Sequence, residues 1–274
     1  MTDMKTRIIS LLVSLACIIS SCAGNNPQAE IFPLPDTPTP RVMQRSLFSD
    51  APDSLIITLG LQDGIPSSVN AFLVKANGLN ILFDAANGAE NSRLMAELAK
   101  CGVAPEDINL IYLTHLHGDH IGGLMQQGMA SFPNAELYIN KIEYDSWMAM
   151  PQEKTTKLRN TLQAYKVTTF LPDKSFWQDN MAGTTFMSTE LPGEVTAIGA
   201  YGHTMGHTIY LMGNVLIAGD FIHGMALQAR YPEFCAVYDM DKDAAVATRK
   251  GILKMAEEKG LEVYGMHLPA PYSL

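Results

Sequence analysis

Cysteine is scarce in this chain. Four of the 274 residues are cysteines, and none lies in a Cys-x-x-Cys or Cys/His spacing. A disulfide-rich scaffold and a cysteine-ligated zinc module are therefore excluded. We expect any metal site to use other ligands, and at most one disulfide, between Cys101 and Cys235, if the protein reaches an oxidising compartment.

Positive charge is also in short supply. Charged residues make up 17% of the chain. It contains 19 basic and 28 acidic residues, which gives a net charge of −9 with histidine neutral. Proteins that bind nucleic acid usually carry clustered Lys and Arg that contact phosphates. Nucleic acid is therefore not an expected partner. No internal repeat with a fixed period is visible, which argues against a repeat array.

Apolar sequence, in contrast, is plentiful at 47% of residues, enough for one large α/β domain or two small ones. The N-terminus has the regions of an export signal: two basic residues, the apolar run Ile8–Ile19, and small residues before Cys22. The run is short for a permanent membrane span. Residues 19–22 (ISSC) resemble the lipobox of bacterial lipoproteins, in which the cysteine becomes the lipidated first residue.

We therefore predict a lipoprotein signal peptide over residues 1–21 and lipidation at Cys22. The alternatives are an ordinary signal peptide cut nearby, or lipidation at Cys17. The prediction implies export in a bacterium and a lipid anchor in a membrane, with the protein facing the periplasm or the cell surface. Residues 22–50 are polar and rich in proline, so we predict a flexible tether there. The functional domain is then expected over residues 51–274.

Strand and helix patterns alternate through that domain, which indicates an α/β class. Alternating or continuous apolar runs predict the strands, and apolar residues at helical spacing predict the helices. The predicted strands are Leu55–Gly60, Val69–Lys75, Leu79–Asp84, Ile108–Leu113, Glu136–Ile139, Val195–Ile198, Thr208–Met212, Val215–Ala218 and Leu261–Tyr264. The predicted helices are Glu90–Cys101, Glu153–Tyr165 and Lys242–Lys259.

A dense group of ionisable residues follows the buried strand that ends at Leu113. The sequence reads His115-Leu116-His117-Gly118-Asp119-His120. In extended backbone His115 and His117 project to one side, and Gly118 permits a turn that sends Asp119 and His120 elsewhere. Imidazole and carboxylate ligands suit zinc, and also iron or manganese. The string predicts two adjacent metal sites; the alternative is a polar loop with a chance cluster.

This string resembles the HxHxDH motif of the metallo-β-lactamase superfamily. Further resemblance lies in residues 68–88, 202–207, 218–220 and 266–269, so that it covers about residues 55 to 270. It implies an αββα sandwich of two mixed sheets flanked by helices. It also implies that His115, His117 and His203 hold one metal, that Asp119, His120 and His267 hold another, and that Asp220 bridges them. Five of the seven histidines of the chain fall on these positions.

The resemblance further implies a hydrolase in which a hydroxide shared by two divalent metal ions, zinc in the first instance, attacks the substrate. Asp119 would orient the hydroxide and pass its proton to the leaving group. Asp84 matches a family aspartate that orients a histidine ligand. His223 stands where lactonases of the superfamily carry a tyrosine, and is either a pocket residue or part of the core. His207 has no assigned role.

Other features narrow the reaction. The seven residues after His267 leave no room for the C-terminal domain of glyoxalase II, and the stretch from His120 to His203 is too short for the nuclease branch. Asp220 argues against class B β-lactamases, which lack an aspartate there. The remaining resemblance is to the branch of methyl parathion hydrolase and related lactonases, with a small ester, lactone or phosphotriester as substrate. The alternatives are a β-lactamase-like hydrolase, a mononuclear iron oxygenase and a non-catalytic metal-binding lipoprotein.

Overall fold

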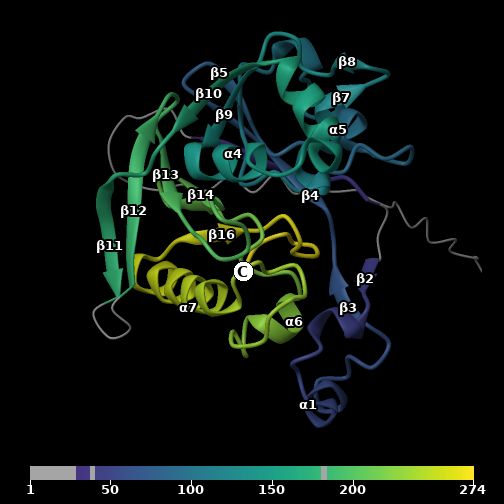
Figure 1. Cartoon of the computed structure of the whole chain (residues 1–274), viewed down its shortest axis with the longest axis vertical. Helices are drawn as coiled ribbons and strands as arrows, with labels where there is room; N and C mark the ends of the chain where they lie inside the picture. Colours follow the sequence, from purple (N-terminus) through teal and green to yellow (C-terminus); the bar gives the residue numbers. More distant parts are fainter. Residues whose placement is uncertain (1–28, 38–40, 180–183) are drawn as a thin grey trace, which may run out of the picture.

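The computed structural model describes residues 29–37, 41–179 and 184–274. The predicted signal peptide and Cys22 lie outside the described residues. In the described part of the chain, two six-stranded sheets form the centre (Figure 1). The first sheet runs in the order β1 (Glu30–Pro35), β4 (Asn70–Ala76), β5 (Leu79–Phe83), β6 (Leu110–Tyr112), β9 (Glu136–Asn140) and β10 (Lys166–Phe170). The second runs in the order β11 (Lys174–Asp179), β12 (Thr184–Leu191), β13 (Val195–Gly199), β14 (Thr208–Met212), β15 (Val215–Ile217) and β16 (Glu262–Tyr264).

Both sheets are mixed. In the first, β1, β4 and β5 are antiparallel neighbours, and β5, β6, β9 and β10 continue in parallel. In the second, β11 to β15 form an antiparallel meander, and β16 joins β15 in parallel. Two short ribbons, β2 (Arg41–Met43) with β3 (Ile65–Ser67) and β7 (Met125–Gln126) with β8 (Met129–Ala130), complete the strands described.

Four of the seven described helices pack on the sheets: α2, α4 and α5 on the first sheet and α7 on the second, whereas α1 and α6 pack in a satellite core beside β3 and α3 is a single turn in the loop after β6. They are α1 (Asp53–Thr58), α2 (Leu94–Lys100), α3 (Gly118–Ile121), α4 (Lys141–Met148), α5 (Gln152–Gln163), α6 (Met225–Gln228) and α7 (Lys242–Lys259). Short 3-10 turns lie at η1 (Arg45–Phe48), η2 (Pro105–Asp107) and η3 (Gly122–Leu124). No described helix is both long and apolar enough to cross a membrane.

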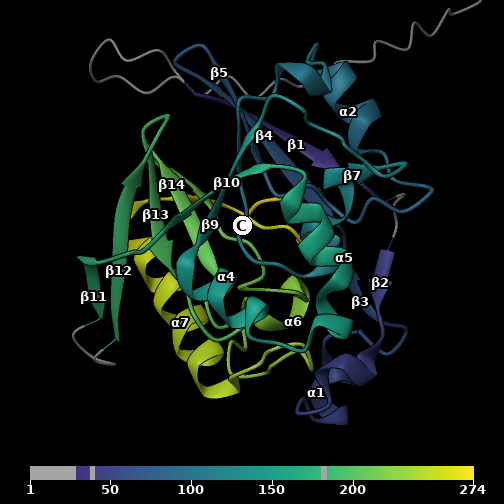
Figure 2. The ribbon, with the colours of Figure 1, turned by 45° about the horizontal axis from the view of Figure 1, so that its top comes forward.

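Side-chain alternation along the strands builds three apolar layers. On β4, Leu73 packs into a core shared with α2 and α5, whereas Phe72 and Val74 point into a second core between the two sheets. A third core lies between the second sheet and α7, where Ile252 and Met255 pack. Figure 2 shows α7 and α5 on opposite sides of the sheets. The predicted αββα sandwich of two mixed sheets is confirmed.

Several local predictions are wrong. The segment 55–60 is not a strand: α1 spans Asp53–Thr58, and the short apolar run buries Ile56 on one side of a helix while Ile57 stays exposed. The predicted helix 90–101 begins only at Leu94. Strands β10 to β12 are not among the predicted elements, because polar residues interrupt their apolar pattern. Cys101 and Cys235 are free thiols.

The flexible tether predicted over residues 22–50 is wrong from residue 30, in the part that the structure describes. Residues 30–35 form β1, which pairs with β4 along its whole length at the edge of the first sheet. Its prolines are tolerated because an edge strand leaves one side of its backbone unpaired. Leu34 is fully buried, and Phe48 of η1 packs in a satellite core with Ile56 and Ile65. Structure therefore begins before residue 51.

Candidate metal centre

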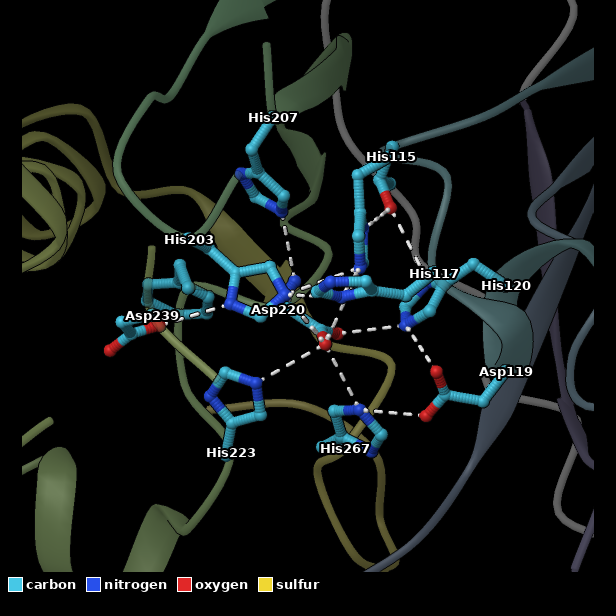
Figure 3. A network of polar contacts seen from close by, with 12 residues as sticks. His115, His117, Asp119, His120, His203, His207, Asp220, His223, Asp239 and His267 are labelled. Carbon is cyan, nitrogen blue, oxygen red and sulfur yellow. Dashed lines mark hydrogen bonds and ion pairs between the residues drawn. The ribbon is translucent and has the colours of Figure 1, made fainter. Parts of the chain in front are cut away.

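Four chain segments deliver the predicted ligands to one place. His115 follows β6, His203 follows β13, Asp220 follows β15 and His267 follows β16, so each lies just beyond the end of a strand. Strands of both sheets therefore end at the same edge of the sandwich. Figure 3 shows the side chains converging there. The structure brings together all seven predicted metal ligands.

Three imidazole nitrogens form a compact triangle. Nε2 of His115 lies 2.9 Å from Nδ1 of His117, which lies 3.0 Å from Nε2 of His203. The third edge, between the Nε2 atoms of His203 and His115, measures 3.2 Å. Zinc with metal–nitrogen bonds of about 2.0–2.1 Å and tetrahedral angles separates neighbouring nitrogens by roughly 3.3–3.4 Å. The triangle is therefore close to the size that one such cation requires.

A second group lies beside the triangle and is more open. Oδ2 of Asp119 is 3.5 Å from Nε2 of His267, and Oδ1 of Asp119 is 3.9 Å from Nε2 of His120. The Asp119 side chain is 35% exposed, whereas those of His120 and His267 are buried. Asp119 is therefore the ligand of this group that solvent can reach.

Asp220 lies between the two groups. Its Oδ1 is 3.2 Å from Nε2 of His120, and its Oδ2 is 3.1 Å from Nε2 of His267. The same Oδ2 lies 3.4 Å from His203 and 3.8 Å from His115. One buried carboxylate thus faces ligands of both groups, which is the arrangement that a bridging carboxylate requires.

The second nitrogen of most of these imidazoles is held by the protein. The Nδ1 contacts are Thr114 Oγ1 for His115 (3.0 Å), Asp84 Oδ2 for His120 (2.6 Å), Asp239 Oδ1 for His203 (3.0 Å) and the Ser68 carbonyl for His267 (2.8 Å). Each of these bonds places the proton on Nδ1 and leaves the lone pair on Nε2, facing the centre. That tautomer is the one a metal ligand needs.

Two inward atoms show that the donor set fits divalent cations. Nε2 of His120 and Oδ1 of Asp220 are buried, and apart from their 3.2 Å contact with each other neither has a hydrogen-bond partner among the described residues. Buried polar atoms without partners are costly, and a cation would satisfy both. The groups His115/His117/His203/Asp220 and Asp119/His120/His267 each place their ligand atoms within 4.8 Å of one another. The His/Asp cluster suggests divalent metal binding.

The charges of the side chains themselves distinguish the two halves of the centre. Burial lowers the pKa of His117 and of His203 to about 4, so these imidazoles are neutral at physiological pH. Burial also acts on His120, but the negative charges of Asp220 and Asp84 outweigh it and raise its pKa. Burial alone would raise the pKa of Asp220, yet the charges of His120 and His267 hold it well below the ordinary value. Asp220 is therefore a carboxylate.

Asp84 contacts the centre from the end of β5. Its carboxylate accepts bonds from the Thr114 backbone N–H (2.8 Å), the Thr114 hydroxyl (2.7 Å) and His120 Nδ1. It is fully buried, and its φ of 55° lies in the left-handed region, which aspartate tolerates better than most residues. The turn thus aims the carboxylate at His120.

His207 supports the backbone of the centre. Its Nδ1 donates to the Ala200 carbonyl at 2.9 Å, and its Nε2 accepts the Asp220 backbone N–H at 3.0 Å. A ring that accepts an N–H must be neutral, and burial lowers the His207 pKa to about 3. A Cβ on Gly219, whose φ is 55°, would lie 2.5 Å from this Nε2. His207 therefore holds the turn that presents Asp220.

His223 faces the centre directly. Its Nε2 lies 3.2 Å from Oδ2 of Asp220, and its ring is stacked on that of His267 with 5.3 Å between centroids. The residue is 1% exposed, its Nδ1 has no hydrogen-bond partner among the described residues, and its Nε2 faces Asp220. Its place is thus in the centre and not on the outer surface.

Sequence reasoning gave no role to two carboxylates beside the centre. Asp239 contacts His203, and Glu143 of α4 contacts the loops on both sides of the triangle. Asp239 lies outside the short strings that carry the resemblance, so they did not single it out. Glu143 lies in a polar helix without any motif, so the sequence offered no signal for it.

The chain belongs to the Metallo-beta-lactamase superfamily, whose family model matches residues 64–267. Among curated relatives, ribonuclease Z of Streptomyces coelicolor is 38% identical over 72 residues, which is 25% of this chain and 22% of that protein. Ribonuclease Z of Saccharolobus islandicus is 40% identical over 73 residues, 26% of this chain and 23% of that protein. These matches span less than a quarter of each ribonuclease.

Similarity to solved structures extends over nearly the whole chain. AidC, a dizinc quorum-quenching lactonase in complex with the product N-hexanoyl-L-homoserine, is 27% identical with a TM-score of 0.72, covering 91% of this chain and 90% of that one. The hydrolase AbOPH of the beta lactamase superfamily is 26% identical with a TM-score of 0.69, covering 92% and 90%. A probable metal-dependent hydrolase from Staphylococcus aureus shares the fold at 20% identity and a TM-score of 0.67, covering 89% and 91%.

Proposed function

We propose that this protein is a hydrolase that binds two divalent metal ions, zinc by preference, and cleaves an ester, lactone or phosphotriester bond of a small molecule. The observation that carries the proposal is the position of Asp220, whose two oxygens face His120 on one side and His203 and His267 on the other. A carboxylate so placed can bridge two cations. Structural zinc sites are usually closed by four protein ligands, whereas the exposed side chain of Asp119 leaves this centre open to water and substrate.

When bound, two cations would supply Lewis acidity that lowers the pKa of a water molecule and polarises the oxygen of the scissile group. The protein contributes the groups around that water. Asp119 is the carboxylate that meets solvent, and we assign it to orient the water and to accept its proton. The oxygen of the water bonds to the acyl carbon or phosphorus, the bond to the leaving oxygen breaks, and Asp119 returns the proton to that oxygen.

His223 is the second proposed catalytic residue. Its unpartnered Nδ1 and its position between His203 and His267 support a role as hydrogen-bond donor to the carbonyl or phosphoryl oxygen of the substrate. Such a donor stabilises the charge that develops on this oxygen as the water attacks. Asp84 is assigned to orient His120 through Nδ1.

The structural relatives support the lactonase end of this range. AidC and AbOPH are similar over nine-tenths of the chain, and one of them binds the product of a lactone. We therefore propose that the protein belongs to the branch of lactonases and methyl parathion hydrolase, and propose lactones and aryl esters as the first substrates to test.

Metal analysis combined with a substrate panel tests the proposal. Purified protein should contain about two zinc ions per chain, and a chelator should abolish hydrolysis of at least one lactone, ester or phosphotriester, with zinc restoring it. Metal-loaded protein that is inactive on every class would overturn the hydrolase proposal and favour a non-catalytic metal-binding protein. One iron per chain would favour a mononuclear oxygenase, and turnover of β-lactams alone would favour a β-lactamase.

The cellular location is proposed from the sequence alone. We propose that Cys22 is lipidated and anchors the protein to a bacterial membrane, facing the periplasm or the cell surface. Mass spectrometry of the mature N-terminus and membrane fractionation of Cys22→Ala test this. A soluble wild-type protein with an unmodified N-terminus would contradict the anchor without affecting the proposed chemistry.

A further inference from the structure

Glu143 is a buried carboxylate without a role in the chemistry described above. It lies in the first turn of α4, and the residue is 1% exposed. Its Oε1 accepts bonds from the Leu116 backbone N–H at 3.0 Å and the Trp147 indole N–H at 2.7 Å. Its Oε2 accepts bonds from the Thr204 hydroxyl at 2.7 Å and the Gly206 backbone N–H at 2.9 Å. Both oxygens are thus fully used as acceptors.

Three of the four partners of Glu143 belong to the two loops that carry the histidine triangle. Leu116 lies between His115 and His117, in the loop that follows β6 of the first sheet. Thr204 directly follows His203, in the loop between β13 and β14 of the second sheet. One carboxylate therefore joins two loops that come from different sheets.

The contact with the second loop is close enough to require glycine. A Cβ on Gly206 would lie 2.2 Å from the Glu143 backbone nitrogen and 2.6 Å from its Cα. The loop thus rests directly on the start of α4. Trp147, one turn further along this helix, donates to Glu143 and sets its indole edge-to-face against His117, with 5.7 Å between centroids. Helix α4 thus contacts His117 directly through Trp147, and through Glu143 it contacts the loops that carry His115 and His203.

We infer that Glu143 is a positioning residue that preforms the His115/His117/His203 triangle and thereby raises the metal affinity of this half of the centre. This inference rests on the metal centre proposed above. None of the hydrogen bonds of Glu143 in the described structure goes to Asp119, His120 or His267, so the affinity of that group should not depend on this carboxylate. A site whose ligands are already in place loses less conformational freedom when the cation binds.

The substitution Glu143→Gln tests the acceptor role with little change of shape. All four partners are donors, and the amide replaces one acceptor oxygen with an NH2 group. A backbone N–H cannot accept a hydrogen bond, so the amide must oppose either Leu116 or Gly206 and release one loop. The matched control is Glu190→Gln on β12, an exposed carboxylate that accepts a bond from the Thr196 hydroxyl.

Two variants that each lack one metal ligand allow the zinc affinity of each half of the centre to be measured separately. His267→Ala removes a ligand from the open group and leaves the triangle intact, whereas His203→Ala does the reverse. Zn2+ affinity is measured in competition with a chromophoric chelator. In the His267→Ala background, Glu143→Gln should weaken zinc binding by about 10- to 100-fold, the range found when partners of metal ligands are removed. In the His203→Ala background it should change the affinity less than twofold.

The inference would be overturned if Glu143→Gln left the zinc affinity unchanged in the His267→Ala background. It would also be overturned if zinc affinity fell equally in both backgrounds, because equal losses would indicate a general structural effect. A wild-type chain that binds no zinc would refute the proposed metal centre itself, which is a different result. If Glu143→Gln does not fold, Trp147→Phe and Thr204→Val each remove one donor and keep the packing. Each should then weaken zinc binding at the triangle by a smaller factor, and unchanged affinity in both would reject the role of Glu143.

Discussion

Nδ1 of His203 lies 3.0 Å from Oδ1 of Asp239, and the other oxygen of Asp239 accepts a bond from Nη2 of Arg249 at 3.1 Å. All three side chains are buried. Arg249, on α7, also donates to the Phe221 and Pro232 carbonyls at 2.7 Å each. Burial would raise the pKa of Asp239, but the bond from His203 and the nearby positive charges lower it to about 2. Helix α7 is thereby connected to the metal centre.

The substitution Asp239→Asn should weaken this connection. An amide oxygen can accept from His203 or from Arg249 but cannot neutralise the buried guanidinium. We expect the zinc affinity of the triangle to fall about 10-fold or more, and the free energy of unfolding to fall by about 3 kcal/mol. Zinc titration and urea unfolding measure the two effects. Asp241→Asn is the control, because Asp241 caps α7 and asparagine caps equally well; equal behaviour of both variants would contradict the role of Asp239.

Asp84→Asn should act on the other half of the centre. Asparagine tolerates the left-handed backbone of this turn, so the change affects mainly the acceptor of His120 Nδ1. We expect the open group to lose zinc affinity by about 10- to 100-fold while the triangle keeps its ion. Metal content after dialysis should fall from two ions towards one. Two retained ions with unchanged turnover would show that Asp84 does not orient His120.

The pH dependence of stability should report on His207. Its pKa of about 3 in the folded protein lies below the ordinary value of 6.5, so the unfolded chain binds a proton between these values that the folded chain does not. The stabilisation from neutral His207 is thus fully present above pH 6.5 and is lost as the pH falls towards 3.

The test compares wild type with His207→Gln after removal of metal by a chelator. Glutamine can also donate to Ala200 and accept from the Asp220 N–H, but it does not titrate. Between about pH 4 and 6 the free energy of unfolding of the variant should fall less steeply, by about 1.4 kcal/mol per pH unit. Urea unfolding at several pH values gives both slopes, and parallel slopes would refute a buried neutral His207.

His223→Ala tests the proposed donor to the substrate oxygen. Loss of such a donor costs about 100-fold in kcat, and His223→Gln, which keeps a donor, should recover part of the loss. Zinc content should stay at the wild-type value in both variants. Unchanged kinetics with every active substrate would eliminate the role, and loss of an ion from His223→Ala would indicate that His223 is itself a ligand.

Some parts of the fold were readable from local patterns. Helix α7 matches its prediction at both ends because its N-cap Asp241 and its left-handed C-terminal Gly260 are explicit signals. The tether prediction failed at β1 because a proline-rich edge strand looks like a linker until its partner strand is known. The strand predicted over residues 55–60 was wrong because a short apolar run does not distinguish a strand from a helix.

For the centre, the sequence by itself determined the family and the seven side chains that converge, because these residues stand in short strings that resemble the motifs of the superfamily. Only the tertiary structure decided what holds them. Glu143 accepts hydrogen bonds from Leu116 and Thr204, which are 27 and 61 residues away in the sequence. Asp239 contacts His203, which is 36 residues away. No local period encodes such contacts, since a hydrogen bond between distant segments exists only once the two sheets pack and bring the ends of their strands together.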